Sequence, residues 1–193
     1  MIKVAVVYHS GSGHTKKMAE AVHEGAGSVS GATSELISIE GKDIIEGRWK
    51  NDAVLNKLDS ADAIIFGAPT YMGSASAQME CFIDATSEKW MTQSWRDKIA
   101  GGFSVSGGPS GDKVNTLIRF ATLAMQHGMI WVGLGMTPYN DKGLNRLSFY
   151  FGAAGQAGQE SPDVAPNAAD KQTGVELGKR IAEITKKFKS EGR

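Results

Sequence analysis

Short apolar runs along the chain alternate with longer segments in which apolar residues recur at helical spacing. The runs cover residues 2–7, 36–39, 61–67, 98–104 and 130–133, and their content of Val, Ile, Ala and Phe is typical of strands buried on both faces of a sheet. Strands that alternate with helices form a parallel sheet with right-handed crossovers. We therefore expect residues 1–193 to form one α/β domain with three layers around a five-stranded parallel sheet.

Five helices are predicted from apolar positions that share one face. The first carries Met18, Ala21, Val22 and Gly25; the second runs from Asn51 to Leu58; the third, capped by Ser74 or Ser76, carries Met79, Phe82 and Ile83; the fourth, opened by Asp112 and ending near Gly128, carries Val114, Leu117, Ile118, Ala121 and Met125; the last carries Leu177, Ile181, Ile184 and Phe188 on its inner face. Residues 41–50 are expected to form a polar connection. Residues 134–169 are rich in Gly, Asn and Pro and longer than an ordinary connection, which makes them a candidate functional loop.

A loop of Ser, Gly and Thr residues, from Ser10 to Thr15, joins the first strand to the first helix. Free backbone N–H groups at a helix N-terminus suit an anion, because the positive end of the helix dipole lies behind them. Gly11 and Gly13 let the backbone curl inward, and the hydroxyl groups of Ser10, Ser12 and Thr15 add donors. The loop lacks the third glycine of a dinucleotide-binding loop and the Gly-Lys-Thr ending of a triphosphate-binding loop. It therefore predicts a monophosphate site, with an ordinary turn as the alternative.

Three loops are expected to meet beyond the carboxyl ends of the strands, where ligands bind in open parallel sheets. They span residues 10–15, 68–73 and 104–111. The second loop offers a rigid backbone, a hydroxyl, an aromatic face, a thioether and a glycine, in the order Pro69, Thr70, Tyr71, Met72 and Gly73. This set suits a flat ring with polar edges. The alternative is that the loop only ends the strand and that Tyr71 covers the core.

Composition excludes several classes of function. Lys plus Arg equal Asp plus Glu at 21 each, so no overall field favours nucleic acid or an anionic membrane. No apolar stretch reaches the length of a membrane span, and the first residues lack the order of a signal peptide, so we expect a cytoplasmic protein without membrane insertion. The single cysteine, Cys81, is expected to be a small core residue. The four histidines lack metal-ligand spacing, and no metal site is predicted.

The segment from Ile64 to Asp84 carries the most specific resemblance to a known family. It contains Phe-Gly-Ala-Pro-Thr-Tyr-Met-Gly, then Gln-Met, then Phe-Ile-Asp. Further agreement comes, in the same order as in the family, from Ser10, Gly13, His14, Thr15, Trp90, residues 98–100 and residues 127–129. On these motifs the chain resembles the WrbA-type NAD(P)H:quinone oxidoreductases, which have a flavodoxin-like fold.

The resemblance implies a set of cofactor contacts for FMN. It assigns the phosphate to Ser10, Gly11, Ser12, Gly13, His14 and Thr15, the ring and ribityl chain to Pro69, Thr70, Tyr71, Met72 and Gly73, and the ring border to Ser104, Val105, Ser106, Gly107 and Gly108. Trp90 corresponds to a wall of the substrate pocket. The chain departs from the family at Ser12, where an aromatic residue is common, at Tyr71 and Met72, which replace Arg and Phe, and at residues 109–112, which replace a longer threonine- and glycine-rich loop.

The resemblance further implies two-electron hydride transfer from NADH or NADPH through FMN to a quinone, in a homodimer or homotetramer. His127 is then the candidate catalytic residue, as a hydrogen-bond donor to the quinone oxygen that gains charge. A purely structural alternative is that His127 favours the negative end of the preceding helix. The main functional alternative is a flavodoxin-type FMN electron carrier. Such carriers are highly acidic, whereas this chain has a formal net charge of zero. A regulatory binding module is a third possibility, and no basic cluster in the sequence supports contact with nucleic acid.

Overall fold

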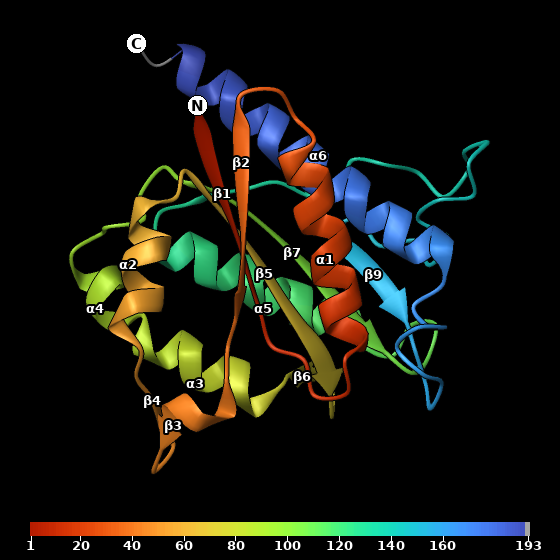
Figure 1. Cartoon of the computed structure of the whole chain (residues 1–193), viewed down its shortest axis with the longest axis horizontal. Helices are drawn as coiled ribbons and strands as arrows, with labels where there is room; N and C mark the ends of the chain where they lie inside the picture. Colours follow the sequence, from red (N-terminus) through yellow and green to blue (C-terminus); the bar gives the residue numbers. More distant parts are fainter. Residues whose placement is uncertain (192–193) are drawn as a thin grey trace.

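A parallel sheet forms the middle layer of the computed structural model, which describes residues 1–191 (Figure 1). Its order is β2-β1-β5-β7-β8, with β9 paired to the far part of β7. The bounds are β1 Ile2–Tyr8, β2 Ala32–Ser38, β5 Ala63–Tyr71, β7 Ile99–Ser106, β8 Ile130–Trp131 and β9 Ala153–Gln156. The five-stranded parallel sheet and the flavodoxin-like α/β fold expected from the sequence are confirmed. The order of the strands changes direction at β1, because β2 lies on one side of it and β5 on the other. The loops after β1 and β5 are therefore neighbours.

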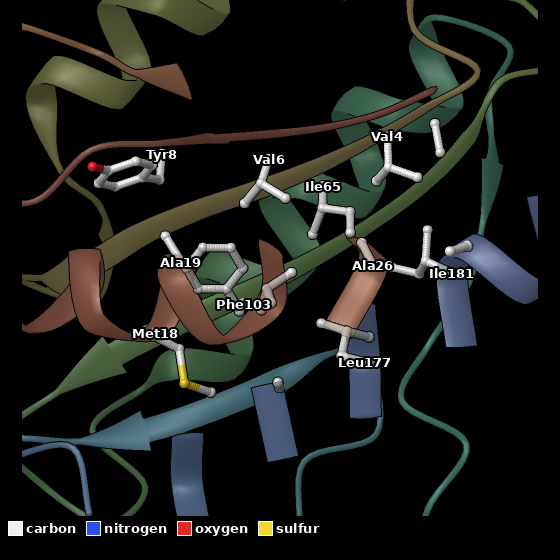
Figure 2. Close-up of a cluster of buried hydrophobic side chains, with 14 of the residues drawn as sticks. Val4, Val6, Tyr8, Met18, Ala19, Ala26, Ile65, Phe103, Leu177 and Ile181 are labelled. Atoms are coloured by element: carbon white, nitrogen blue, oxygen red, sulfur yellow. The ribbon is translucent and has the colours of Figure 1, made fainter. Parts of the chain in front are cut away.

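Helices cover both faces of this sheet. On one face lie α1 His14–Gly27 and α6 Ala168–Glu191, and on the other lie α2 Asp52–Ser60, α3 Ala77–Ala85, α4 Ser87–Met91 and α5 Lys113–Gln126. The first face packs Val4, Val6, Ile65 and Phe103 from the strands against Met18, Leu177 and Ile181 from the helices (Figure 2). Helices α1 and α6 can cross closely because residues 25 and 178 are glycines. A Cβ at either position would overlap a backbone carbonyl of the other helix. No helix within residues 1–191 combines the length and the apolar character needed to cross a bilayer.

Two strands differ from their predicted bounds. Strand β2 begins at residue 32, ahead of the predicted residue 36, because its first half alternates between half-buried and exposed positions at the sheet edge and so shows no apolar run. Strand β5 continues through Pro69 to Tyr71, beyond the predicted end at Gly67. Proline is tolerated at position 69 because its missing N–H would point toward the position of β1, and β1 has already ended at Tyr8.

The fifth strand position is divided between two strands. Only Ile130 and Trp131 pair with the start of β7, and β9 takes over as the partner of residues 103–106. Residues 133–152 leave the sheet between these two strands. The prediction of one continuous strand at 130–133 was therefore only partly right, because the strand continues 20 residues later in the sequence.

Smaller elements also depart from the sequence expectations. Residues 41–50 form a 3-10 turn, Gly41–Asp43, and a hairpin of β3 Ile44–Ile45 and β4 Arg48–Trp49. The indole of Trp49 is buried, with its ring centroid 5.2 Å from that of Phe82. Ser76 precedes α3 but does not cap it, because its Oγ lies 2.8 Å from Nδ1 of His9. Ser74 lies in the short strand β6 Ser74–Ala75, so neither serine is the predicted side-chain cap.

The predicted inner faces of two helices were partly wrong. On α5, Leu117 and Ala121 are buried as predicted, but Val114, Ile118 and Met125 are exposed. Polar residues occupy part of the true inner face, with Lys113 and Thr116 fully buried beside Leu117 and Phe120, so the apolar pattern indicated a face turned away from the core. On α6, Leu177 and Ile181 are buried, whereas Phe188 is exposed near the end of the helix.

Candidate functional site

The three predicted loops converge at the carboxyl edge of the sheet and line one cavity of about 530 Å³. The predicted cofactor residues on its wall are Ser12, His14, Thr15, Pro69, Thr70, Tyr71, Val105, Ser106 and Gly107. Ser10, Gly11 and Gly13 line an adjoining cavity of about 650 Å³, whose wall Tyr71 also shares. Met72, Gly73, Ser104 and Gly108 line neither cavity. The structure therefore brings together most, but not all, of the residues that the sequence assigns to one ligand.

The first loop presents free backbone donors at the start of α1. The hydroxyl oxygen of Ser10 accepts hydrogen bonds from the amides of Gly13, at 3.1 Å, and Lys16, at 3.2 Å. Since Ser10 Oγ acts there as an acceptor, its own hydrogen stays free to donate. The amides of residues 11, 12, 14 and 15 have no hydrogen-bond partner within residues 1–191. Gly13 has a φ of +90°, a conformation that L side chains rarely adopt and that turns the loop into the helix. Free donors in this arrangement suit an anion.

The side chain of Tyr71 lies over the first loop and does not cover the core. A Cβ atom added at Gly11 would lie 2.5 Å from the Tyr71 hydroxyl oxygen, so the loop is open there only because residue 11 is glycine. Tyr71 is half exposed, and its ring separates the two cavities. The alternative in which Tyr71 covers the core is wrong, and the residue is placed to contact a ligand that enters either cavity.

Buried hydroxyl groups join the second and third loops beneath the cavity. Thr70 Oγ1 lies 2.8 Å from Ser104 Oγ and 2.7 Å from Thr116 Oγ1, and Ser104 Oγ donates to the backbone oxygen of Ala68 at 2.8 Å. The side chain of Ser104 is fully buried. Ser104 therefore supports the loops without facing a ligand. Met72, with a φ of 49°, and Gly73, with a φ of 80°, form the tight turn between β5 and β6, and the Met72 side chain is fully exposed.

A fourth segment, residues 157–162, completes the cavity wall. His14 Nε2 donates to the backbone oxygen of Glu160 at 2.7 Å, since a carbonyl can only accept. Pro162 lies so close to Gly13 that a Cβ added there would be 2.8 Å from Pro162 Cγ. Amide N–H groups of Gly158 and of Glu160 itself keep the pKa of the Glu160 carboxyl below its ordinary value. The sequence indicated a functional loop within residues 134–169, but its only signals were length and glycine content, so no single residue of this segment was predicted.

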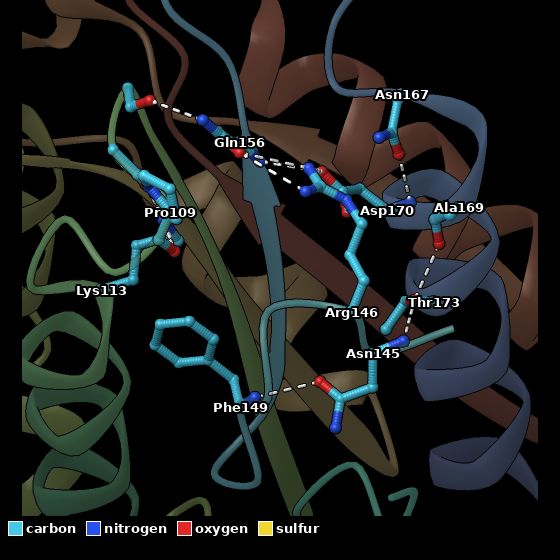
Figure 3. Close-up of polar contacts among 12 residues, drawn as sticks. Pro109, Lys113, Asn145, Arg146, Phe149, Gln156, Asn167, Ala169, Asp170 and Thr173 are labelled. Atoms are coloured by element: carbon cyan, nitrogen blue, oxygen red, sulfur yellow. Dashed lines mark hydrogen bonds and ion pairs between the residues drawn. The ribbon is translucent and has the colours of Figure 1, made fainter. Parts of the chain in front are cut away.

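A polar network supports the third loop from below (Figure 3). Lys113 Nζ donates to Ser106 Oγ at 2.9 Å, to the Gly108 oxygen at 2.7 Å and to the Pro109 oxygen at 3.1 Å. Burial lowers the pKa of Lys113 to about 8. Sequence reasoning missed this residue because the pattern placed Val114, and not Lys113, on the inner face of α5.

The opposite side of the same loop is held by residues that are distant in sequence. Arg146 forms a two-pronged ion pair with Asp170, with both N–O distances at 2.8 Å. Both Asp170 and Arg146 contact Gln156: the carboxylate accepts from the Gln156 amide at 3.0 Å, and the guanidinium donates to the Gln156 side-chain oxygen at 3.4 Å. Gln156 Nε2 in turn donates to the backbone oxygen of Gly107 at 3.2 Å. Residues 106–109 are therefore held on two sides.

His127 and Trp90 lie together, but away from the three loops. They line a hollow of about 280 Å³ with residues of α3 and α5. His127 precedes β8, whose Ile130 pairs with the first residue of β7, whereas Ser104 to Gly108 lie at the other end of β7. An eight-residue strand spans about 25 Å. Within one chain, the predicted catalytic residue and the predicted cofactor loops therefore lie at opposite edges of the sheet.

The imidazole of His127 is buried and neutral. Burial lowers its pKa to about 4. Thr86 Oγ1 donates its hydrogen to the backbone oxygen of Ile83, so the 3.0 Å contact between His127 Nε2 and Thr86 Oγ1 requires the hydrogen to be on Nε2. His127 Nδ1 is then an acceptor, and it has no partner within residues 1–191. The ring stacks on Trp95 with centroids 4.5 Å apart. Within the same described range, no group of three His, Cys, Asp or Glu residues is placed to hold a metal ion.

Comparisons with known proteins agree with this arrangement. Residues 2–136 match a family described as NADPH-dependent FMN reductase. A protein named Flavodoxin FldP from Pseudomonas aeruginosa is 41% identical over 190 residues, which cover 95% of this chain and 97% of that protein. A protein named NAD(P)H dehydrogenase (quinone) from Archaeoglobus fulgidus is 34% identical over 201 residues, which cover 97% and 100%. Among solved structures, a flavodoxin, WrbA-like protein from Agrobacterium tumefaciens is similar with a TM-score of 0.75 and 39% identity, over 97% of this chain and 99% of that one.

Proposed function

Because the chain belongs to the NADPH-dependent FMN reductase family, as a WrbA-type FMN-dependent oxidoreductase, we propose that it transfers two electrons from NAD(P)H through FMN to a quinone. The observation that carries this proposal is the meeting of the free amides of the first loop with the cavity between the second and third loops. One ligand with an anionic tail and a flat ring matches both parts of this site.

The residues present fit FMN in charge and in size. The amides of residues 11, 12, 14 and 15, the free hydrogen of Ser10 and the N-terminus of α1 suit the phosphate group. The neighbouring cavity of about 530 Å³ is within the range of sites for small organic ligands. Pro69, Tyr71 and Val105 supply apolar contact for a ring, and the backbone of residues 105–107 supplies polar contacts at its edge.

FMN supplies the hydride chemistry when bound, because its ring can accept a hydride from a nicotinamide and pass two electrons to a quinone. The chain's own residues bind the phosphate, orient the ring and exclude water. Tyr71 is placed to cover the ring cavity, and the segment 157–162 closes the side next to the first loop through the His14–Glu160 hydrogen bond. No acid, base or nucleophile of the chain is required for the transfer of hydride to the ring.

We further propose that the active protein is a homodimer or homotetramer in which the hollow with Trp90 and His127 lies opposite the cofactor cavity of another copy. The support is the separation of these two sites to opposite edges of the sheet in one chain. In that arrangement Trp90, which is half exposed, contacts the quinone. His127 donates to the quinone oxygen when its Nε2–H exchanges Thr86 Oγ1 for that oxygen, and Thr86 lines the same hollow.

The test of the main proposal is turnover. Purified protein loaded with FMN is mixed with an excess of NADH or NADPH, with and without benzoquinone, and nucleotide oxidation is followed by absorbance. We expect many turnovers per protein only when the quinone is present. The absence of FMN uptake at micromolar concentration would contradict the proposal at its first step.

A flavodoxin-type electron carrier is the second candidate, favoured by the name of the 41% identical relative. The formal net charge of zero weakens it, because such carriers dock through strongly acidic surfaces. The same assay separates the two functions. A carrier would oxidise about one equivalent of nucleotide per flavin at most, with or without the quinone.

A further inference from the structure

Lys113 places a buried positive charge at the first turn of α5. Its side chain is fully buried, and its three hydrogens are taken by neutral oxygens of Ser106, Gly108 and Pro109. The N-terminus of a helix is the positive end of its dipole, so a cation there is unfavourable. Burial of a charge adds a further cost unless an opposite charge compensates it. The ammonium group of Lys113 therefore lies at a position where both the helix dipole and burial disfavour a positive charge.

The charged groups around Lys113 do not neutralise it through a direct ion pair within residues 1–191. Arg146, from the segment 133–152, and Asp170, from α6, are the charged residues that act on it, and they pair with each other at 2.8 Å. Strands β7 and β9 contribute no charged residue, and Asp112 precedes Lys113 on its own element. Arg146 and Asp170 therefore compensate each other, Asp112 is exposed, and the ammonium group of Lys113 is held beneath the third loop by neutral oxygens. The face of the Phe149 ring, 5.5 Å from Nζ, covers another side of the amine.

Ser106 connects this charge to the cofactor cavity. It lines the cavity, and its Oγ accepts a hydrogen bond from Lys113 Nζ at 2.9 Å. A hydroxyl that accepts from an ammonium group becomes a stronger donor through its own hydrogen. Gly111 preserves the room for this hydroxyl, because a Cβ there would overlap Ser106 Oγ. The positive charge is thereby placed one side chain away from any ring that fills the cavity.

Resting on the proposed function, we propose that Lys113 is a positioning residue that raises the redox potential of bound FMN. It acts through Ser106 on the negative charge that the ring acquires on two-electron reduction. In this step NAD(P)H gives up a hydride, which carries two electrons and one proton, and leaves as NAD(P)⁺. The neutral ring that accepts the hydride gains one negative charge. The Lys113–Ser106 pair therefore stabilises the reduced ring more than the oxidised ring.

This role differs measurably from a structural one. A residue that only shapes the third loop would strengthen the binding of oxidised and reduced FMN equally, and the midpoint potential would not depend on it. A charge that acts on the reduced ring changes the ratio of the two dissociation constants. That ratio fixes the shift in midpoint potential, by about 30 mV for each factor of ten in a two-electron couple.

The experiment measures both quantities in the full chain loaded with FMN. Fluorescence quenching gives the Kd of oxidised FMN, and a redox titration gives the two-electron midpoint potential. For Lys113→Met we expect the Kd of oxidised FMN to rise less than about threefold and that of reduced FMN to rise about ten times more than that of oxidised FMN, which lowers the potential by about 30 mV. Lys179→Met removes an exposed lysine of α6 as the matched control, and its potential should equal that of the wild type.

Two further variants keep the proposal falsifiable if Lys113→Met does not fold. Ser106→Ala leaves the helix and its lysine in place and should also lower the potential. Lys113→Arg keeps the charge and should have a potential close to that of the wild type. An unchanged potential in Lys113→Met, or in Ser106→Ala where the first variant is unfolded, overturns the proposal. Failure of the proposed function is distinct from this, because it shows in the wild-type chain, as no FMN uptake or no quinone-dependent turnover, before any variant is compared.

Discussion

The imidazole of His14 donates a 2.7 Å hydrogen bond to the backbone oxygen of Glu160, 146 positions later in the sequence. This contact joins the first loop to the segment 157–162 and closes one side of the cofactor cavity. It is the main polar link between the phosphate site and a segment that the sequence alone did not single out. If FMN occupies this cavity, as proposed, its binding should depend on residues on both sides of this bond.

Removing this bond should weaken FMN binding without unfolding the protein. We expect His14→Ala to raise the Kd of FMN about fivefold, because one partly buried hydrogen bond contributes about 1 kcal/mol. Fluorescence quenching by the wild type and the variant measures the change. His23→Ala is the control. His23 lies on the far part of α1, and its Nδ1 is 2.9 Å from Ser34 Oγ. Equal Kd values for His14→Ala and the wild type would refute a contribution of this bond.

The backbone at Gly13 should be essential for the phosphate site. Gly13→Ala adds strain of about 1–2 kcal/mol from the left-handed conformation and brings a Cβ within 2.8 Å of Pro162. The matched control is Gly47→Ala, at a φ of +76° in the β3–β4 hairpin with open space around it. Both variants should lower the Tm of the protein without FMN, but only Gly13→Ala should raise the Kd of FMN, by roughly tenfold or more, through lost bonds to the phosphate. Similar Kd values for the two variants would mean that the first loop does not hold the phosphate.

The buried His127 should make the protein less stable in mild acid. Its pKa is about 4 in the folded chain, against an ordinary value of 6.5, so the unfolded chain binds the proton more readily. Stability from this group is therefore fully present above pH 6.5 and is lost as the pH falls toward 4, up to about 3 kcal/mol. Urea unfolding at pH 7.5 and pH 4.5 should show a smaller loss in His127→Gln than in the wild type. An identical loss in both proteins would show that His127 is not held neutral by burial.

A site divided between two copies should recover activity when two defective variants are mixed. Gly13→Ala disables the first loop, and Trp90→Ala alters the hollow at the opposite edge of the sheet. In randomly mixed dimers about a quarter of the sites combine an intact loop with an intact hollow. After the two proteins are unfolded and refolded together, we expect quinone reduction at about that fraction of the wild-type rate. A mixture no more active than its separate components would mean that the hollow with Trp90 and His127 does not complete the cofactor site of another copy.

The order of elements and the convergence of the three loops on one cavity could be predicted from sequence because both follow from local patterns. Continuous apolar runs such as residues 61–67 and the glycine-serine loop at 10–15 carry their own signals. The contribution of Lys113 could not be predicted, because a buried lysine on an inner helix face reverses the pattern used to assign that face. Residues 134–169 were predicted to form a functional loop, but the place of segment 157–162 beside Gly13 and His14 was not, because it depends on a tertiary approach. The separation of His127 from the loops could not be predicted either, because it depends on the length of β7, which lies between them.

The divided fifth strand connects the edge of the sheet to the supports of the third loop. Strands β8 and β9 each pair with β7, and the excursion of 21 residues between them also adds Leu134 and Phe149 to the buried core. Arg146 and Phe149 belong to that excursion and touch the supports of the third loop. The same segment therefore completes part of the core and braces the third loop, so a change in its length or sequence affects both.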